Sequence, residues 1–174
     1  ALQQTIAKVV PAITGASSSV SNEIEFLLTS FVTAFQHIPR HRRVKLFVSL
    51  IKTLGCNRSL HLILFLIAQQ YSANIAKGKM PECSSLLDFV AALMKTFTAD
   101  QCLDSICGFF NLWDTIPESE LDKHSDEYSA LSGRSVFGSA IVNLTTSELG
   151  LLKKRMLSFI NQTLKADEEM SLTS

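Results

Sequence analysis

The stretch IPRHRRVKLFVSLIKTLG, residues 38–55, has apolar side chains at the spacing of one face of a helix. The stripe consists of Val44, Phe47, Val48, Ile51 and Leu54. Pro39 suits the first position of a helix because it has no N–H group to leave unpaired. Gly55 suits the position just past the end, where glycine readily adopts the left-handed conformation. The pattern predicts one helix bracketed by Pro39 and Gly55.

The start of this predicted helix is strongly basic. Its charged or partly charged members are Arg40, His41, Arg42, Arg43 and, slightly further on, Lys45. Cations are unfavourable there because the first turn of a helix already carries a partial positive charge. Either carboxylates from the acidic stretch after residue 113, or from Glu82 and Asp88, offset the arginines, or the arginine side chains stay in water. If the arginines are unpaired, this turn becomes the first candidate for a partner contact.

Helical spacing of apolar residues extends over nearly the whole chain. It predicts further helices at about 2–13, 20–35, 60–71, 84–97, 100–113, 136–144 and 146–164. Residues 60–71 are apolar almost all round, which predicts a helix buried on several sides. Glu23 and Glu25 suit the acidic first turn of the second helix. The predicted N-caps are Ser84 or Ser85, Asp100, and Thr146 or Ser147.

About eight helices and no strand predict an all-α fold. Short connections favour antiparallel neighbours, and degenerate two-helix units stacked in a row are typical of a HEAT-like α-solenoid. A single closed bundle is the alternative. The predicted organisation is helical repeats over 1–113, an acidic mobile linker over 114–134, a C-terminal helical pair over 135–166 and a frayed tail over 167–174.

The composition bounds the class of protein. The chain has 174 residues, of which 47% are apolar and 18% charged, so it is long and apolar enough for one folded domain. Sixteen basic residues balance sixteen acidic ones, which disfavours nucleic-acid binding through a broad basic face but allows a local patch. No apolar run reaches the roughly 18 residues of a membrane span. The chain opens on Ala1 within a helical pattern, as expected of a piece of a longer protein.

Residues that would carry chemistry are sparse. The cysteines predict reduced thiols in apolar surroundings, with Cys102 and Cys107 in the core. His37 and His41 have the four-residue spacing of two zinc ligands, but Pro39 between them argues against a shared helical face. Trp113 suits the edge of the core, with a stacking platform for a base as the alternative. No phosphate loop or nucleophile motif occurs, so no catalytic, cofactor-binding or metal-binding residue is predicted, and an enzyme is not expected.

One segment resembles a known family. FQHIPRHRRVKLFVSLIKTLG, followed closely by LHLILFLIAQQY, is similar to the HEAT repeat-containing protein one family of animals, which is the U-three protein ten family of yeast. The matching positions are Phe35, His37, Ile38, Pro39, His41, Arg42, Arg43, Thr53, Leu54, Gly55, Gln70 and Tyr71. Val44, His61 and Gln69 depart from the family pattern without changing the helical register.

The resemblance implies a large HEAT-repeat scaffold of the small-subunit processome, of which this chain would be a segment from the C-terminal half. It implies a nuclear, nucleolar, non-catalytic role in ribosomal RNA transcription and early processing of the small-subunit RNA. The implied partners are WD-propeller and other processome proteins, with pre-ribosomal RNA and the U-three small nucleolar RNA particle contacted indirectly. No membrane, cofactor or small-molecule substrate is expected.

The alternative function is a direct RNA-binding module. Its contacts would come from Arg40, Arg42, Arg43 and Lys45, with Arg58 as a further candidate. Against it, the basic run occurs once, whereas an RNA-binding solenoid is expected to repeat its basic stripe along its length.

Overall fold

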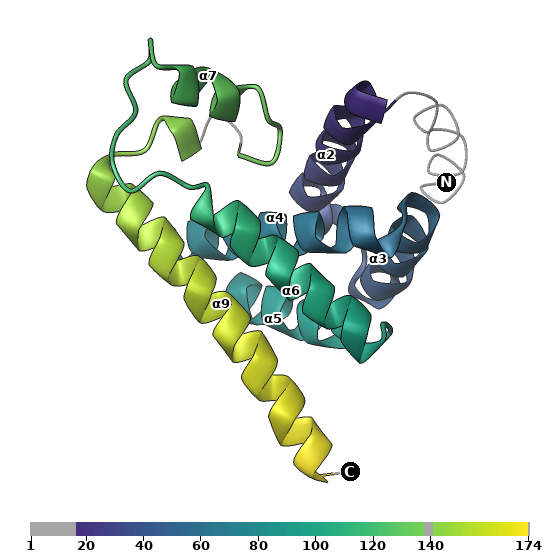
Figure 1. Ribbon diagram of the computed structural model, residues 1–174. Helices are drawn as coiled ribbons and strands as arrows, with labels where there is room; N and C mark the ends of the chain where they lie inside the picture. Colours follow the sequence, from purple (N-terminus) through teal and green to yellow (C-terminus); the bar gives the residue numbers. More distant parts are fainter. Residues whose placement is uncertain (1–16, 138–140, 174) are drawn as a thin grey trace.

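The computed structural model describes residues 17–137 and 141–173, and it describes side chains for 20–137 and 141–166. The ordered elements in these ranges are all helices, with no strand (Figure 1). They are α2 (Ser17–Thr33), the short 3-10 helix η1 (Phe35–His37), α3 (Arg40–Leu54), α4 (Cys56–Ala76), α5 (Met80–Met94), α6 (Ala99–Asp114), α7 (Asp126–Ser132) and α9 (Thr146–Thr173). The predicted all-α class is confirmed. The helix predicted over 2–13 lies outside the described residues.

Helix α4 is the centre of the fold. It contacts α2, α3, α5, α6 and α9. These neighbours cover the middle of α4, which leaves few positions where a polar side chain could reach water. Leu62, Leu64 and Leu66 are all buried, although Leu64 lies on the opposite side of the helix from Leu62 and Leu66. The prediction that residues 60–67 form the most enclosed part of the chain is confirmed, because an almost wholly apolar helix is stable only when several neighbours cover it.

Helix α3 is bracketed by Pro39 and Gly55. Pro39 lies at the N-cap, and the C-cap Gly55 has φ of 99° while its N–H donates to the Ile51 carbonyl. The buried face of α3 brings Phe47 into edge-to-face contact with Phe89, with ring centroids 5.1 Å apart. Phe35 lies against the same Phe89 ring at 4.9 Å. This aromatic cluster joins η1, α3 and α5 beneath the basic turn.

The starts of α5, α6 and α9 differ from the prediction, either in the first residue of the helix or in the residue that caps it. Helix α5 starts at Met80, with a proline in its first turn, so neither Ser84 nor Ser85 caps it. Thr98 caps α6 through a reciprocal capping box with Gln101, in place of Asp100. At α9, Thr145 accepts from the Glu148 N–H while the Glu148 carboxylate accepts from the Thr145 N–H, one residue before the predicted cap.

The segment 114–134 is not a loop throughout. It contains α7, and the Ser125 hydroxyl caps this helix by accepting from the Tyr128 N–H. The acidic residues Asp126 and Glu127 lie in its first turn, where they complement the helix dipole. The acidic composition that suggests a linker therefore partly reflects the favoured charge of a helix start.

The end of this segment is fastened to α2 and α4. Arg134 donates from Nε and Nη2 to Oε1 of Glu25 on α2, across 109 residues of sequence. The Gln69 amide on α4 donates to the Val136 carbonyl at 2.6 Å. Glu25 thus lies inside α2, buried, and the prediction that it belongs to an acidic first turn is wrong because the helix starts no later than Ser17.

Helix α9 runs along one side of the molecule and contacts α4 and α5 (Figure 1). Trp113, at the end of α6, is half-buried at the core's edge and donates from Nε1 to the Lys153 carbonyl at 3.0 Å. The backbone of residues 167–173 continues α9, where the sequence predicts a frayed tail. The short helix predicted over 136–144 falls partly outside the described residues.

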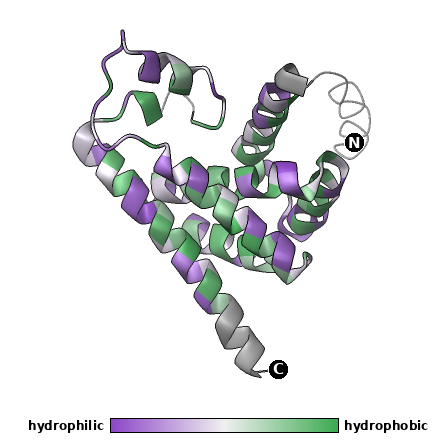
Figure 2. Cartoon of the chain, in the orientation of Figure 1, coloured by the Kyte–Doolittle hydropathy of each residue, from purple (hydrophilic) through white to green (hydrophobic). Residues whose placement is uncertain are grey.

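Hydrophobic and hydrophilic residues share each helix, as packing around one core requires (Figure 2). Among the helices described, none has the length and apolar content needed to cross a membrane.

Candidate interaction surface on helix α3

The structure separates the four basic residues of the predicted site. Arg40, Arg42 and Lys45 are exposed, whereas Arg43 is only 6% exposed. Neighbouring residues of a helix point in different directions. Arg43 lies on the same side of α3 as Phe47 and Leu50, which are buried in the core. The basic turn is therefore two features, an inward arginine and an outward set of cations.

Arg43 is held by uncharged partners. Its Nε donates to the Ile38 carbonyl at 2.9 Å and its Nη1 donates to the Ser85 hydroxyl at 3.0 Å. Its guanidinium lies over the Phe35 ring, 4.2 Å from the centroid. Burial, and secondarily the charge of Arg40, lower the pKa of Arg43, but an arginine remains protonated in proteins.

The expected carboxylate partner of the arginines is not found. Across the described part of the chain, the one salt bridge joins Arg134 to Glu25. Of the two alternatives for the arginines, pairing of Arg42 or Arg43 with carboxylates of the acidic segment or of α5 is therefore not found. A carbonyl, a hydroxyl and an aromatic ring satisfy Arg43 because it reaches the α3–α5 contact, where these groups face it.

Arg40 has a different environment from Arg42. It lines a shallow groove of about 230 Å³ together with Ser85, Asp88 and Phe89 of α5. Asp88 thus lines the same groove as Arg40, although no ion pair forms between them. The side chains of Arg42 and Lys45 form no ion pair with any residue described, and both side chains are exposed, so both charges face solvent.

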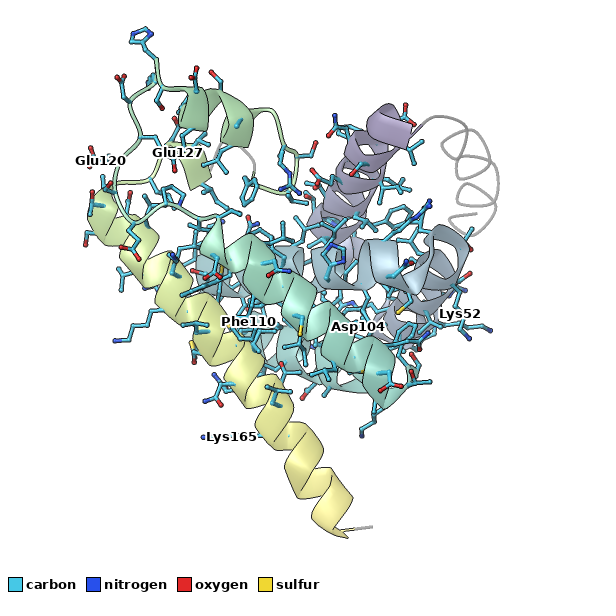
Figure 3. The ribbon with its side chains drawn as sticks, in the orientation of Figure 1. Lys52, Asp104, Phe110, Glu120, Glu127 and Lys165 are labelled. Atoms are coloured by element: carbon cyan, nitrogen blue, oxygen red, sulfur yellow. The ribbon has the colours of Figure 1, made fainter. Side chains whose placement is uncertain are left out.

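The outward side of α3 carries only cations and hydroxyls. We refer to it as the α3 face, and its exposed members are His41, Arg42, Lys45, Ser49, Lys52 and Thr53. Figure 3 shows Lys52 at the outer edge of the molecule, away from the other helices. Sequence reasoning overlooked Lys52, although its seven-residue spacing from Lys45 places both on one helical face. Arg58, the further candidate, is also exposed but lies in the first turn of α4.

The surrounding sequence does not neutralise this face. Residues 26–81 contain eight lysines and arginines and no aspartate or glutamate. The neutral charge of the whole chain conceals this asymmetry, because acidic residues gather after residue 81. The local patch that a neutral chain still permits is therefore present on α3.

A second candidate, a groove of about 460 Å³ between α4 and α6, combines a thiol, an imidazole and a carboxylate. Its lining residues are Cys56, Asn57, His61, Gln101, Asp104 and Ser105. Burial raises the pKa of the Cys56 thiol, and Asp104 adds to this effect. Burial also lowers the pKa of His61. An activated cysteine has a lowered pKa, so the shift at Cys56 runs opposite to the one that a nucleophilic thiol needs.

The same groove depends on a close approach of two helices. A Cβ atom added to Gly108 would lie 2.8 Å from His61, so glycine is needed where α6 meets α4. His37 and His41 are both exposed, and nowhere in 17–137 or 141–166 do three or more His, Cys, Asp or Glu side chains gather in a metal-binding arrangement.

The cysteines form no disulfide in the described ranges. Cys83 is buried and Cys102 is half-buried, donating to the Met94 carbonyl at 3.2 Å. Cys107 is exposed, so its predicted place in the core is wrong. Its position in α6, five residues after Cys102, turns it away from the core and onto the outer side of the helix.

Cys107 belongs to an exposed apolar surface along the contact of α6 with α9. The two helices run antiparallel, because Trp113 meets Lys153 while Cys102 and Ile106 line a groove with Thr163 and Leu164. Figure 3 shows Phe110 between these helices. We refer to this surface as the α6–α9 face, and its exposed members are Leu103, Cys107, Phe110, Leu157 and Leu164.

The described fold is all-helical, with neighbouring helices packed against α4, and helix-on-helix packing of this kind is the architecture of helical-repeat proteins. A family model described as HEATR1-like, HEAT repeats matches residues 19–172. The chain belongs to this family. The resemblance found in residues 35–71 is confirmed, and it extends over most of the chain.

Curated relatives extend the match to nearly every residue. The chain is 55% identical over 170 residues to the U3 small nucleolar RNA-associated protein 10 of Debaryomyces hansenii, and 54% identical over 168 residues to that of Scheffersomyces stipitis. Identity to the Candida albicans protein of the same name is 50% over 175 residues. These matches cover 96% to 100% of the chain but only 9% or 10% of each relative's length. No solved structure matches the chain significantly.

Proposed function

We propose that this chain is a non-catalytic scaffold segment of the small-subunit processome. In this proposal it acts in the nucleolus and supports pre-ribosomal RNA transcription and early processing of the small-subunit RNA through protein–protein contacts. The printed name of its relatives, U3 small nucleolar RNA-associated protein 10, supports membership of such an assembly. WD-propeller proteins and other proteins of the same assembly are the proposed partners.

The α6–α9 face is the observation that carries the scaffold proposal. Leu103 is 61% exposed, and Phe110 and Leu164 are also exposed along the same antiparallel pair. Apolar residues scattered singly need no explanation, but a contiguous apolar surface on a folded protein is typical of an interaction site. Aromatic and leucine side chains at the centre of an interface supply the apolar area that association removes from water.

The absence of a reactive arrangement supports the same proposal. In the groove between α4 and α6 that gathers a thiol and an imidazole, burial raises the pKa of the Cys56 thiol, which disfavours the nucleophilic thiolate. In this proposal, the role of the fold is to present helix faces at fixed positions. Stacked helices do this well because each helix is held by its neighbours over its whole length.

The test is a pair of variants in the full-length protein. Leu103→Glu/Phe110→Glu places two charges at the middle of the α6–α9 face, while the control Phe26→Glu alters an apolar residue that is 67% exposed on α2. We expect the double variant to lose co-purification of the other assembly proteins and to accumulate unprocessed precursor RNA. The control is expected to behave as the unmodified protein.

Thermal unfolding of both variants separates lost contacts from lost folding. Both sites are exposed, so the midpoint is expected to change little. A folded double variant that still co-purifies with the full assembly and supports normal processing would contradict the scaffold role of this face.

A further inference from the structure

We infer that the α3 face binds the sugar–phosphate backbone of RNA directly. The scaffold function proposed above needs only protein contacts, so this inference extends beyond it. The cations that would contact phosphates are Arg42, Lys45 and Lys52, with His41 at one end of the same face. Ser49 and Thr53 supply hydroxyl groups among these cations.

The first support is unneutralised charge. Residues 26–81 contain no carboxylate, and within the described structure neither Arg42, Lys45 nor Lys52 forms an ion pair. Keeping several cations together without counter-charges is electrostatically unfavourable in an isolated protein. A polyanion removes that repulsion and gains entropy by releasing its own condensed counterions.

The second support is the start of α3 itself. Pro39 at the N-cap provides no side-chain hydrogen bond, and the first turn contains no acidic residue. The partial positive charge of the helix N-terminus is therefore not offset by the helix's own residues, and it lies beside the cations of the α3 face. Helix dipole and side chains thus add to one positive field.

The third support is the linear arrangement of the cations. Arg42 and Lys52 are ten positions apart, which corresponds to about 15 Å along the axis of a helix. Lys45 lies between them on the same side of α3. A line of this length is long enough to contact more than one phosphate of an RNA strand.

Arg43 keeps this line in place without contacting RNA. Its bonds to the Ile38 carbonyl and the Ser85 hydroxyl fix the turn before α3 and join the helix to α5. The guanidinium also packs against Phe35. Arg43 is therefore a positioning residue, and the outward cations are presented from a turn that is already ordered before RNA arrives.

The chemistry of the α3 face favours RNA over a folded acidic protein. A specific protein interface needs an apolar centre, usually with aromatic side chains. The exposed side chains of α3 include no large apolar residue, since Val44 and Val48 are half-buried against the core. The face exposes no Phe, Tyr or Trp ring, and His41 and Arg42 are its only groups that could stack on a base, so we expect mainly contacts to phosphate and sugar with little sequence preference.

The test measures RNA binding by the full-length protein at several salt concentrations. The probes are a fluorescent 20-nucleotide oligouridine and a 20-base-pair RNA duplex, followed by fluorescence anisotropy. The variant is Arg42→Glu/Lys45→Glu/Lys52→Glu. Its matched control is Lys123→Glu/Lys154→Glu/Lys165→Glu, which makes the same change in net charge at exposed positions elsewhere.

We expect the α3 variant to bind RNA about tenfold or more weakly near 0.1 M salt, and its salt slope to fall by about two ions. The control is expected to retain both values. An equal loss of RNA affinity in the two variants would show that only net charge matters, and it would overturn the inference. Unchanged RNA binding by the α3 variant would also overturn it.

The same variants separate RNA from an acidic protein and from the scaffold proposal. We expect the α3 variant to keep the assembly proteins with which the full-length protein co-purifies. Loss of an acidic protein partner with RNA affinity unchanged would overturn the inference. If RNA binding fails the test while the α6–α9 variant still loses its partners, the scaffold function stands alone.

Discussion

The α3 face and the α6–α9 face are built alike and present opposite chemistry. Helices α3 and α6 have 15 and 16 residues, and each buries one side against α4. Outward, α3 exposes cations and hydroxyls, whereas α6 and α9 together expose leucines, a phenylalanine and a cysteine. The fold therefore constrains the inner sides of its helices and leaves each outer side free to acquire its own partner.

The buried sides of α3 and α6 have the same chemical character. Phe47 on α3 and Phe109 on α6 are both fully buried, and each has an aromatic neighbour. The pattern of apolar residues alone would therefore not distinguish α3 from α6. The difference resides in exposed side chains, which contribute little to folding and much to recognition.

The largest effect on this comparison is expected from the shared interior. Phe47→Ala removes a fully buried ring that contacts Phe31, Phe35 and Phe89, and it should lower the free energy of unfolding by about 3–5 kcal/mol. Urea unfolding followed by circular dichroism measures the loss. Leu103→Ala, on the α6–α9 face, should change it by less than about 0.5 kcal/mol. A loss below about 1 kcal/mol for Phe47→Ala would place the ring outside the core.

A somewhat smaller effect is expected at the Arg134–Glu25 pair. Glu25 is 4% exposed and one of its oxygens, Oε2, has no protein partner, so it depends on Arg134 for its charge. Because Arg134 is 37% exposed and water screens part of the interaction, Arg134→Met should cost about 1–3 kcal/mol. The double variant Glu25→Leu/Arg134→Met should recover part of the loss in urea unfolding. Strictly additive losses would show that the pair is not coupled.

Neighbouring arginines give a sharper contrast within the α3 region. Arg43→Met breaks two hydrogen bonds and should cost about 1–2 kcal/mol. Arg42→Met should stay within about 0.5 kcal/mol of the unmodified protein, because its side chain is exposed. Chemical unfolding of the two variants in parallel compares them directly. Equal losses would mean that Arg43 is not the structural member of the turn.

The smallest effect is a pH dependence from His61. Burial, and then the charge of Arg134, lower the pKa of His61, while Glu25 raises it by a lesser amount. The unfolded chain then binds more protons than the folded chain below about pH 6.5, so His61 should destabilise the fold as pH falls through that region. His61→Gln should show a shallower fall in unfolding free energy between about pH 7 and pH 5. Identical pH profiles would exclude this contribution.

The fold was predictable where apolar spacing is dense. Residues 44–54 and 60–71 specify their helices because each turn buries a large side chain, and Pro39 and Gly55 mark the ends of the first one. Cap residues were less predictable, since Ser, Thr and Asp occur close together and only backbone geometry selects among them. Thr98 in place of Asp100 is one such case, where the reciprocal bond with Gln101 decides the start of α6.

The candidate sites were predictable only in part. Basic residues at 40–45 are visible in the sequence, and Lys52 follows from helical spacing. The inward turn of Arg43 depends on Phe35 and Ser85, and the second of these is 42 residues away. The Arg134–Glu25 pair has no local signal, because the fold alone brings together residues separated by 109 positions.

The central claim is that the two faces serve different partners, and crosslinking tests it most directly. Full-length protein carrying either the α3 triple variant or Leu103→Glu/Phe110→Glu would be ultraviolet-crosslinked to RNA and, in parallel, chemically crosslinked to proteins inside the assembly. We predict that the α3 variant loses RNA crosslinks in α3 while its protein crosslinks remain, and that the α6–α9 variant shows the reverse. Loss of both kinds of crosslink in each folded variant would contradict the separation of the two faces.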